Sequence, residues 1–381
     1  MARIMVGSYA IRFPLGGYLS WVLQWLLGFH RLGHEVYFVE KSGYPNSCFN
    51  PITKLASDDC LYGIETFRNF LGRFGLENSW CYVDASEKYY GIPKNRIEAL
   101  FRSADLFVDM GSHGAWLEEA SNTGRTALID GEPAYRQFKL HELLISGGAL
   151  PNYDYYYTVG TNIGTSRSPV PTLGLNWRPI FDPVVIDLFP VRPVQSGAPF
   201  TTVMSWSAHQ PVLFKGTTYG QKDAEFLKFL DLPAAVNAPL EIAVSGKNVP
   251  VERLASAGWR IRDSIAATLS FDKWRDYISA SRGEFSVCKN VFVATNCGFF
   301  SDRSAIYLAS GRPVVIQDTG MSSHLPCGRG LFAVRTVAEA AAAIESIEND
   351  YQLHSTSARE IAVGILSSNT VLSRFLRDVG L

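Results

Sequence analysis

The chain alternates between short apolar runs and amphipathic stretches from its first residues. Residues 3–9 are typical of a buried strand, and Ser20 is placed to cap a helix that runs to about Leu32, where Gly33 ends it. Residues 35–40 form the next apolar run. A strand, a helix and a second strand in this order predict a βαβ unit, in which both strands lie parallel in a sheet covered by helices.

The same alternation continues in two series along the chain. In the first half, apolar runs at 106–109 and 126–130 each end in an aspartate, and another run covers 155–159. Seven prolines then crowd residues 166–200, which predicts a crossing between two domains. The second series has predicted strands at 201–206, 240–244, 259–261, 285–287, 313–316 and 331–334, and predicted helices at 222–231, 272–281, 302–310, 337–348 and 356–366. The pattern predicts an α/β fold of two Rossmann-like, doubly wound domains that face each other across a cleft.

Composition and charge narrow the possible functions. The 381 residues are 47% hydrophobic and 19% charged, enough for two buried cores. With 35 Lys and Arg against 36 Asp and Glu, the net charge of −1 excludes a protein that binds nucleic acid through an overall basic charge, although local basic clusters stay open. No run of about 20 apolar residues predicts a membrane span. The start of the chain has no secretory pattern, and the six cysteines lack zinc-site spacing. These features predict a cytoplasmic protein with free thiols and no metal site.

The stretch from residue 282 to 320 carries the richest polar chemistry. Ser301 is a natural N-cap, so the free amides of Asp302, Arg303 and Ser304 at the start of the next helix can bind phosphate. Arg303 can add a bidentate contact to the same phosphate. The alternative is that Ser301 and Asp302 merely cap the helix and that Arg303 pairs with Asp302 or Glu284.

Further candidates sit where strands of the second series end. Lys222 starts a predicted helix and can reach a diphosphate; Lys289 follows a short strand and competes with it for the same task. Glu284 can accept ribose hydroxyls or pair with neighbouring cations. The remaining candidates are Trp206 for the nucleotide and Asp318, Thr319 and Gly320 for the donor sugar.

The first half offers its own candidates. Gly16 and Gly17 let the backbone approach a ligand closely, unless they form a simple tight turn. His113 follows a strand and is flanked by small residues. It is a candidate general base or phosphate contact, although lone histidines are more often structural. Asp130 and Glu132 follow another strand and can deprotonate an acceptor hydroxyl; a turn built on Asp and Gly is the alternative.

One longer pattern resembles a known family. Residues 309–315 read Ala-Ser-Gly-Arg-Pro-Val-Val, then Asp-Thr-Gly at 318–320 and Gly-Leu-Phe at 330–332. This resembles the C-terminal domain of GT-B glycosyltransferases, where a helix ends in A-x-G-x-P-V-V before a strand, a glycine turn and a G-L strand. The Gly-His-Glu-Val sequence at 33–36 is similar to the N-terminal domain of the same fold.

The chain departs from that family at one place. Retaining GT-B enzymes of the glycogen-synthase-like group carry two glutamates as E-x7-E before this motif. In an ungapped alignment, those positions fall on Gly298 and Ile306, so both carboxylates are missing. The resemblance therefore implies the fold and the place of the donor site, and it assigns neither the stereochemistry nor an acid–base residue.

The resemblance implies a Leloir-type glycosyltransferase that moves a sugar from a nucleotide diphosphate donor, with a UDP-sugar such as UDP-glucose favoured, to a hydroxyl acceptor. It implies no bound metal and no cofactor. Residues 1–190 would bind the acceptor and residues 191–355 the nucleotide-sugar, and residues 356–381 would return to the first domain. Two alternatives stay open: a non-hydrolysing sugar-nucleotide epimerase of the same fold, and a catalytically inactive nucleotide-sugar-binding protein.

The acceptor is expected to be a lipid-linked or polysaccharide intermediate, with at most peripheral contact to a membrane. This expectation is based on the aromatic and basic residues Trp21, Trp25, Phe29 and Arg31. The first three share a helical face, so burial in the core is the competing interpretation.

Overall fold

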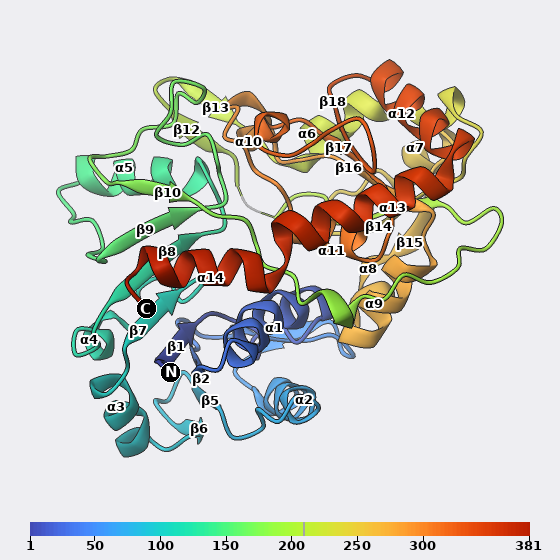
Figure 1. The fold of residues 1–381 in the computed structure, drawn as a ribbon. Helices are drawn as coiled ribbons and strands as arrows, with labels where there is room; N and C mark the ends of the chain where they lie inside the picture. Colours follow the sequence, from blue (N-terminus) through green and yellow to red (C-terminus); the bar gives the residue numbers. More distant parts are fainter. Residues whose placement is uncertain (209) are drawn as a thin grey trace.

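A computed structural model describes residues 1–208 and 210–381 of the protein. In these ranges the strands form one eight-stranded sheet, one six-stranded sheet and two small two-stranded sheets. The large sheets lie in separate parts of the molecule, which we call the first half (residues 1–179) and the second half (residues 200–349). Figure 1 shows helix α1 (Gly16–Arg31) in the first half, and the red helices α13 (Tyr351–Ile361) and α14 (Ser368–Asp378) running from the second half toward the first.

The sheet of the first half has the order β10-β9-β8-β7-β1-β2-β5-β6. Its neighbours are parallel except for the edge strand β6, which pairs antiparallel with β5. Its central strands are buried on both faces, as expected when helices cover a parallel sheet. The strands are β1 (Arg3–Gly7), β2 (Glu35–Lys41), β5 (Trp80–Val83), β6 (Tyr89–Gly91), β7 (Leu106–Asp109), β8 (Thr126–Asp130), β9 (Tyr155–Thr158) and β10 (Trp177–Pro179), with β3 (Cys48–Asn50) and β4 (Leu55–Ser57) pairing apart. The helices are α1 (Gly16–Arg31), α2 (Leu61–Gly72), α3 (Lys94–Arg102), α4 (Leu117–Ala120) and α5 (Tyr135–Ile145).

The sheet of the second half is parallel throughout, in the order β15-β14-β11-β16-β17-β18. Two doubly wound sheets confirm the predicted fold class. The strands are β11 (Phe200–Ser205), β14 (Leu240–Ser245), β15 (Arg260–Asp263), β16 (Gly283–Ser286), β17 (Val314–Gln317) and β18 (Leu331–Val334), and β12 (Val212–Phe214) and β13 (Thr217–Tyr219) form a hairpin. The helices are α6 (Lys222–Phe226), α7 (Val251–Ser256), α8 (Ser264–Thr268), α9 (Phe271–Ala280), α10 (Asn290–Ala294), α11 (Asp302–Ala309) and α12 (Val337–Asn349). Helices α13 (Tyr351–Ile361) and α14 (Ser368–Asp378) follow the second half.

The predicted start of the first helix was wrong. Helix α1 begins at Gly16, with the extended residue Leu15 as its N-cap, four residues before Ser20. Ser20 is buried inside the helix, where its carbonyl oxygen accepts from the side-chain amide of Gln24. A serine in a helix interior and a serine at an N-cap look alike in sequence, because only the tertiary contacts distinguish them.

Two further helices differ in extent from the prediction. Helix α6 ends at Phe226 and continues as a short 3-10 turn, so the expected helix over 222–231 is broken. The helix expected over 356–366 begins earlier, at Tyr351, and passes into a π-helical turn over residues 362–366. That turn redirects the chain toward the first half.

The end of the chain packs on the first half. The amide of Val184 donates to the carbonyl of Leu366, and the amide of Ser368 donates back to Val184, both at 2.8 Å. Helix α14 then lies along α1, as Figure 1 shows. The ring of Phe375 contacts Trp25 with centroids 6.0 Å apart.

This packing explains the aromatic face of α1. Trp25 and Phe29 are fully buried, and Phe29 also contacts Phe375. Trp25 and Phe29 therefore belong to the core, whereas Trp21 is half-buried and Arg31 is exposed. Among the described residues, no helix combines the length and the apolar character that crossing a membrane requires.

Candidate active site

The carboxyl ends of strands from both sheets meet where the two halves touch. Glu132, just after β8, forms an ion pair with Lys289, just after β16. Gly160, two residues after β9, forms an isolated β-bridge with Phe299, and the hydroxyl of Thr161 donates to the carbonyl of Gly298 at 2.9 Å. In doubly wound sheets, ligands bind beyond these strand ends, so this region is the candidate active site.

The start of helix α11 lies at this junction. Its N-cap, Ser301, is buried, yet its side chain caps no helix amide and lies 3.3 Å from a carboxylate oxygen of Asp302 instead. The hydroxyl of Ser304 is also buried, without a hydrogen-bond partner among the described residues. Uncapped first-turn amides and the positive end of the helix dipole favour an anion at this place.

Arg303 is held rigidly beside that helix start. Its guanidinium donates to Glu284 at 2.6 Å, to the Ser286 hydroxyl at 2.6 Å and to the Val203 carbonyl at 3.0 Å. Burial alone would lower the pKa of Arg303, but the Glu284 carboxylate raises it, so the arginine stays charged. The predicted alternative of an Arg303–Glu284 pair is therefore present. It does not exclude phosphate binding, because a guanidinium has five N–H donors.

Lys222 lies close to the same cations. It is the first residue of α6 and is partly buried, and no described residue forms a hydrogen bond or ion pair with its amino group. Burial, followed by the positive charges of Arg303 and Lys289, lowers the pKa of Lys222 to about 7. The amide of Asn290 donates to the carbonyl of Gln221 at 3.3 Å, and Arg303 donates to Ser286, so the segments that carry Lys222, Lys289 and Arg303 adjoin one another. Such a concentration of positive charge matches a diphosphate.

Lys289 connects this cationic group to the first half. Its amino group lies 2.5 and 2.6 Å from the two carboxylate oxygens of Glu132. Lys289 is nearly buried, whereas the side chain of Glu132 remains 40% exposed. The predicted donor-side lysine and one predicted catalytic carboxylate are therefore in direct contact.

Asp130 is placed differently from Glu132. It is fully buried and accepts hydrogen bonds from the Glu132 amide, Arg136, the Gln137 amide group and the Thr158 hydroxyl. Both of its oxygens are engaged in holding the loop after β8. The contacts therefore favour a positioning role for Asp130, with Glu132 presented to the site.

His113 projects from a tight loop after β7. Its φ of 53° lies in the left-handed region, and Asp109 fixes the loop by accepting from the amides of Ser112 and Gly114 at 2.8 Å. Burial and the nearby Arg136 guanidinium lower the pKa of His113, so the imidazole is neutral at neutral pH. A neutral imidazole can accept a proton, which keeps His113 a candidate base.

The two predicted glycines open helix α1 and have different surroundings. A Cβ atom on Gly16 would lie 2.4 Å from the Ser270 carbonyl oxygen and 2.5 Å from the Cβ of Trp274, so Gly16 permits α1 to pack against α9. Gly17 has no described atom within 4 Å of the same position. Only Gly17 therefore leaves open space in which a ligand can approach the backbone.

Two tryptophans of helix α1 hold a carboxylate that was not predicted from the sequence. Asp182 accepts from the indole N–H of Trp21 at 2.9 Å and lies 3.4 Å from that of Trp25. Burial, together with the nearby Asp302 carboxylate, raises the pKa of Asp182 to about 7.

The remaining donor-side candidates have structural contacts. Trp206 is buried against Phe226, with ring centroids 5.7 Å apart. Asp318 accepts from the Gly320 amide and from Arg335, and the Thr319 hydroxyl donates to the Phe299 carbonyl at 2.6 Å. The turn at 318–320 thus supports the junction with the first half through its own hydrogen bonds.

Several residues of the junction were missed by sequence reasoning. Tyr9 and Arg12 follow β1 directly, a position that itself signals a site in a parallel sheet. Glu40 accepts from the Arg12 side chain at 2.9 Å and from three amides of that loop. Asp182 lies within the proline-rich stretch and carries no signal in the sequence. Within residues 1–208 and 210–381, no group of three or more His, Cys, Asp or Glu side chains is arranged to hold a metal ion.

The chain resembles known proteins in its fold but not in its sequence. No family model matches the sequence, and no curated protein sequence does. Solved structures do match. An alpha-glucosyltransferase in complex with UDP and a 13-mer DNA aligns over 100% of this chain and 99% of its own, with a TM-score of 0.60 and 10% identity. Anabaena HepE in complex with UDP-glucose gives 0.57 at 13% identity, and TarM gives 0.54 at 9%, each over 100% of this chain and 99% of theirs.

The chain has the GT-B fold. The motif that carried the resemblance lies where this fold requires it: Gly311 ends α11 with a φ of 66°, and Val314 opens β17. Arg312 between them is buried and donates to the Ser279 carbonyl, so it braces the second half of the GT-B structure.

Proposed function

We propose that the protein is a glycosyltransferase that transfers a sugar from a UDP-sugar, with UDP-glucose the leading donor, to a hydroxyl acceptor. The observation that carries the proposal is that the adjoining segments of Lys222, Lys289 and Arg303 meet near the start of α11. The solved structures of the same fold with UDP or UDP-glucose support the choice of nucleotide.

The chemistry follows from the position of these charges. The bond between the anomeric carbon of the sugar and the diphosphate oxygen breaks, and negative charge builds up on the departing diphosphate. Three cations and the end of α11 stabilise that charge without reorganising during the reaction. A new bond forms to the acceptor oxygen, whose proton passes to Glu132 or, through the neutral imidazole, to His113.

We further propose that transfer needs neither a metal ion nor a cofactor. In many enzymes that transfer phosphorylated groups, a divalent cation neutralises the leaving diphosphate. Here the side chains of Lys222, Lys289 and Arg303 supply positive charge at the place where such a cation would act.

A nucleotide screen followed by an activity assay tests the proposal. UDP should raise the melting temperature more than GDP, ADP or dTDP, because a ligand that binds only the native state stabilises it. Incubation with UDP-glucose should then release UDP, and the rate should rise with a suitable acceptor and persist in EDTA. An epimerase would convert the nucleotide-sugar without net UDP release, and an inactive binding protein would bind UDP but release none. No shift with any nucleotide would refute the proposal.

A further inference from the structure

A pocket of about 690 Å³ opens beside the candidate active site in the first half. It lies at the carboxyl ends of β2 and β5, where Lys41 and Val83 are the last residues of their strands. Ala115, two residues after His113, forms part of its wall and accepts a hydrogen bond from Lys41 at 2.8 Å. Its volume is in the range of sites that bind small molecules.

A row formed by Tyr44, the guanidinium of Arg12, Tyr9 and Tyr18 leads from this pocket toward helix α1. Tyr44, 53% exposed, lines the pocket, and the guanidinium of Arg12 lies between Tyr44 and Tyr9, 5.9 and 5.7 Å from their ring centroids. Tyr9 in turn contacts Tyr18, with ring centroids 5.3 Å apart.

The other end of that row lies beside the loop that carries Glu132. Tyr9 also contacts Trp21, with ring centroids 6.0 Å apart, and the Trp21 ring lies 3.8 Å from the place of a Cβ atom on Gly131, the residue before Glu132. A molecule lying along the row would therefore extend from Glu132 to the pocket.

The charge of the pocket decides between classes of acceptor. Its lining includes five carboxylates and three cations. One of the cations, Lys41, is already paired with Glu119 at 2.7 Å. Glu118 has an exposed side chain and no ion pair with a described residue. A polyanion such as DNA would be repelled here, because nucleic-acid affinity depends on cations that neutralise phosphates.

We propose that the acceptor is an uncharged saccharide chain whose reacting end lies at Tyr18 and Glu132 and whose further units lie in the pocket against Tyr44. Aromatic rings offer apolar faces to sugar rings, and carboxylates accept hydrogen bonds from sugar hydroxyls. This inference rests on the proposed function and distinguishes the chain from the DNA-bound structures of the same fold.

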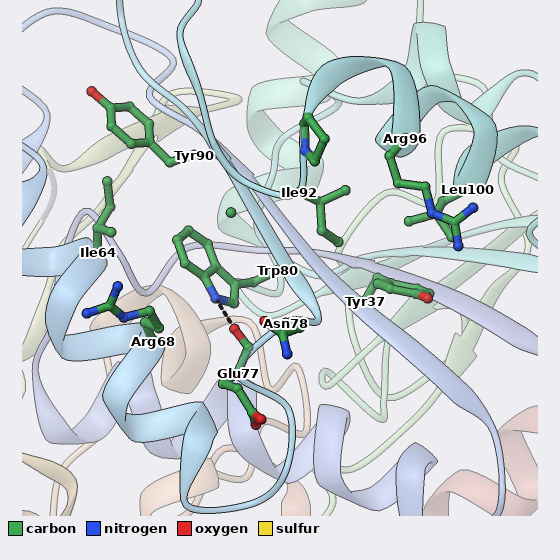
Figure 2. Close-up of a pocket in the computed structure, with 12 residues that line it drawn as sticks. Tyr37, Ile64, Arg68, Glu77, Asn78, Trp80, Tyr90, Ile92, Arg96 and Leu100 are labelled. Atoms are coloured by element: carbon green, nitrogen blue, oxygen red, sulfur yellow. Dashed lines mark hydrogen bonds between the residues drawn. The ribbon is translucent and has the colours of Figure 1, made fainter.

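A second pocket shows the contrast. Figure 2 shows it around Trp80, whose indole donates to the Glu77 carbonyl. It includes Arg68 and Arg96, and it lies at the amino end of β5, at the opposite edge of the sheet from the candidate site. Of these two pockets, the one lined by Tyr44 lies at the carboxyl ends of the strands, on the side of the candidate active site. We therefore assign the acceptor to that pocket.

A binding experiment with the full chain tests the inference. Labelled protein saturated with UDP is applied to an array of neutral oligosaccharides, sialylated and sulfated oligosaccharides, and a 13-mer DNA duplex. The neutral oligosaccharides should retain the protein, and Tyr44→Ala should weaken that binding by roughly tenfold. Tyr62→Ala, on α2 outside the pocket, is the matched control and should bind as the unchanged protein does.

Charge reversal gives a second readout. Glu118→Lys should increase retention on the acidic oligosaccharides, whereas Glu65→Lys, an exposed glutamate on α2, should not. Preference of the unchanged protein for acidic oligosaccharides or DNA, no retention on any neutral oligosaccharide, or equal effects of Tyr44→Ala and Tyr62→Ala would overturn the inference. UDP affinity, measured separately by calorimetry, shows whether the proposed function itself has failed.

Discussion

The amino group of Lys289 lies between the two carboxylate oxygens of Glu132, at 2.5 and 2.6 Å, and so joins the two halves of the protein across the candidate active site. A diphosphate that binds Lys289 must compete with Glu132 for the same charge. Donor binding would then release Glu132 toward the acceptor, so a single ion pair couples the two substrates.

This competition predicts opposite effects of one substitution on binding and on turnover. Glu132→Gln removes the competing charge, so UDP should bind at least as tightly as before. Transfer should fall by about 10²–10⁴-fold if Glu132 accepts the proton. Calorimetry and UDP release measure the two quantities. Lys289→Met is the matched control, because it should weaken UDP binding; a Glu132→Gln variant with full turnover would assign the base to another residue.

Replacing Arg303 tests the diphosphate site and the buried ion pair together. Loss of a charge-assisted contact costs about 1.5–3 kcal/mol, so Arg303→Ala should weaken UDP binding by roughly tenfold or more. The substitution also leaves Glu284 buried without its cation, which should lower the free energy of unfolding by about 3–5 kcal/mol.

The double variant Arg303→Ala/Glu284→Ala separates these effects. It should recover part of the lost stability in urea unfolding while UDP affinity stays low. The exposed pair of Lys139 and Glu142 is the control, since Lys139→Ala should cost no more than about 1 kcal/mol. Unchanged UDP affinity in a folded Arg303→Ala variant would exclude contact with the diphosphate.

The lowered pKa of Lys222 predicts that UDP binding depends on pH. Because the pKa is about 7 in the free protein, Lys222 loses its charge as pH rises through neutrality. A bound diphosphate favours the protonated form, so UDP affinity should decrease from about pH 7 to pH 9, and binding should take up a proton. The second proton of a phosphate is lost near pH 6, so the nucleotide contributes little in this window. Calorimetry in buffers of different ionisation enthalpy measures the uptake. Lys222→Met should abolish the dependence, and an identical pH profile in that variant would assign it elsewhere.

Two adjacent glycines predict contrasting behaviour for the same substitution. Gly16→Ala places a methyl group against the backbone of Ser270 and should destabilise the protein by about 1–3 kcal/mol. Gly17→Ala meets no described atom and should be neutral or stabilise by up to about 1 kcal/mol. Thermal unfolding compares the two variants. Equal melting temperatures would show that α1 does not depend on close contact with α9.

The two-sheet architecture was predictable from the sequence because buried parallel strands are short apolar runs that recur between amphipathic segments. The convergence of Lys222, Lys289 and Arg303 was only partly predictable: each follows a strand or begins a helix, yet only the folded contacts between their segments show that they share one site. Asp182 could not have been found, because its role depends on the indole groups of Trp21 and Trp25, more than 150 positions away. The prediction that Ser20 caps the first helix was wrong for a similar reason: the helix begins at Gly16, which packs closely against Ser270 and Trp274, far away in the sequence.

The packing of α14 on α1 has a consequence for how the chain is made. Synthesis proceeds from the first residue, and domains generally fold as they emerge from the ribosome. Trp25 and Phe29 on α1 contact Phe375, which follows them by about 350 positions in the chain. The strands of the first half are therefore synthesised long before α14, and this apolar face of α1 gains its contact with Phe375 only once α14 has been made. The last folding step of the first half waits for the second half.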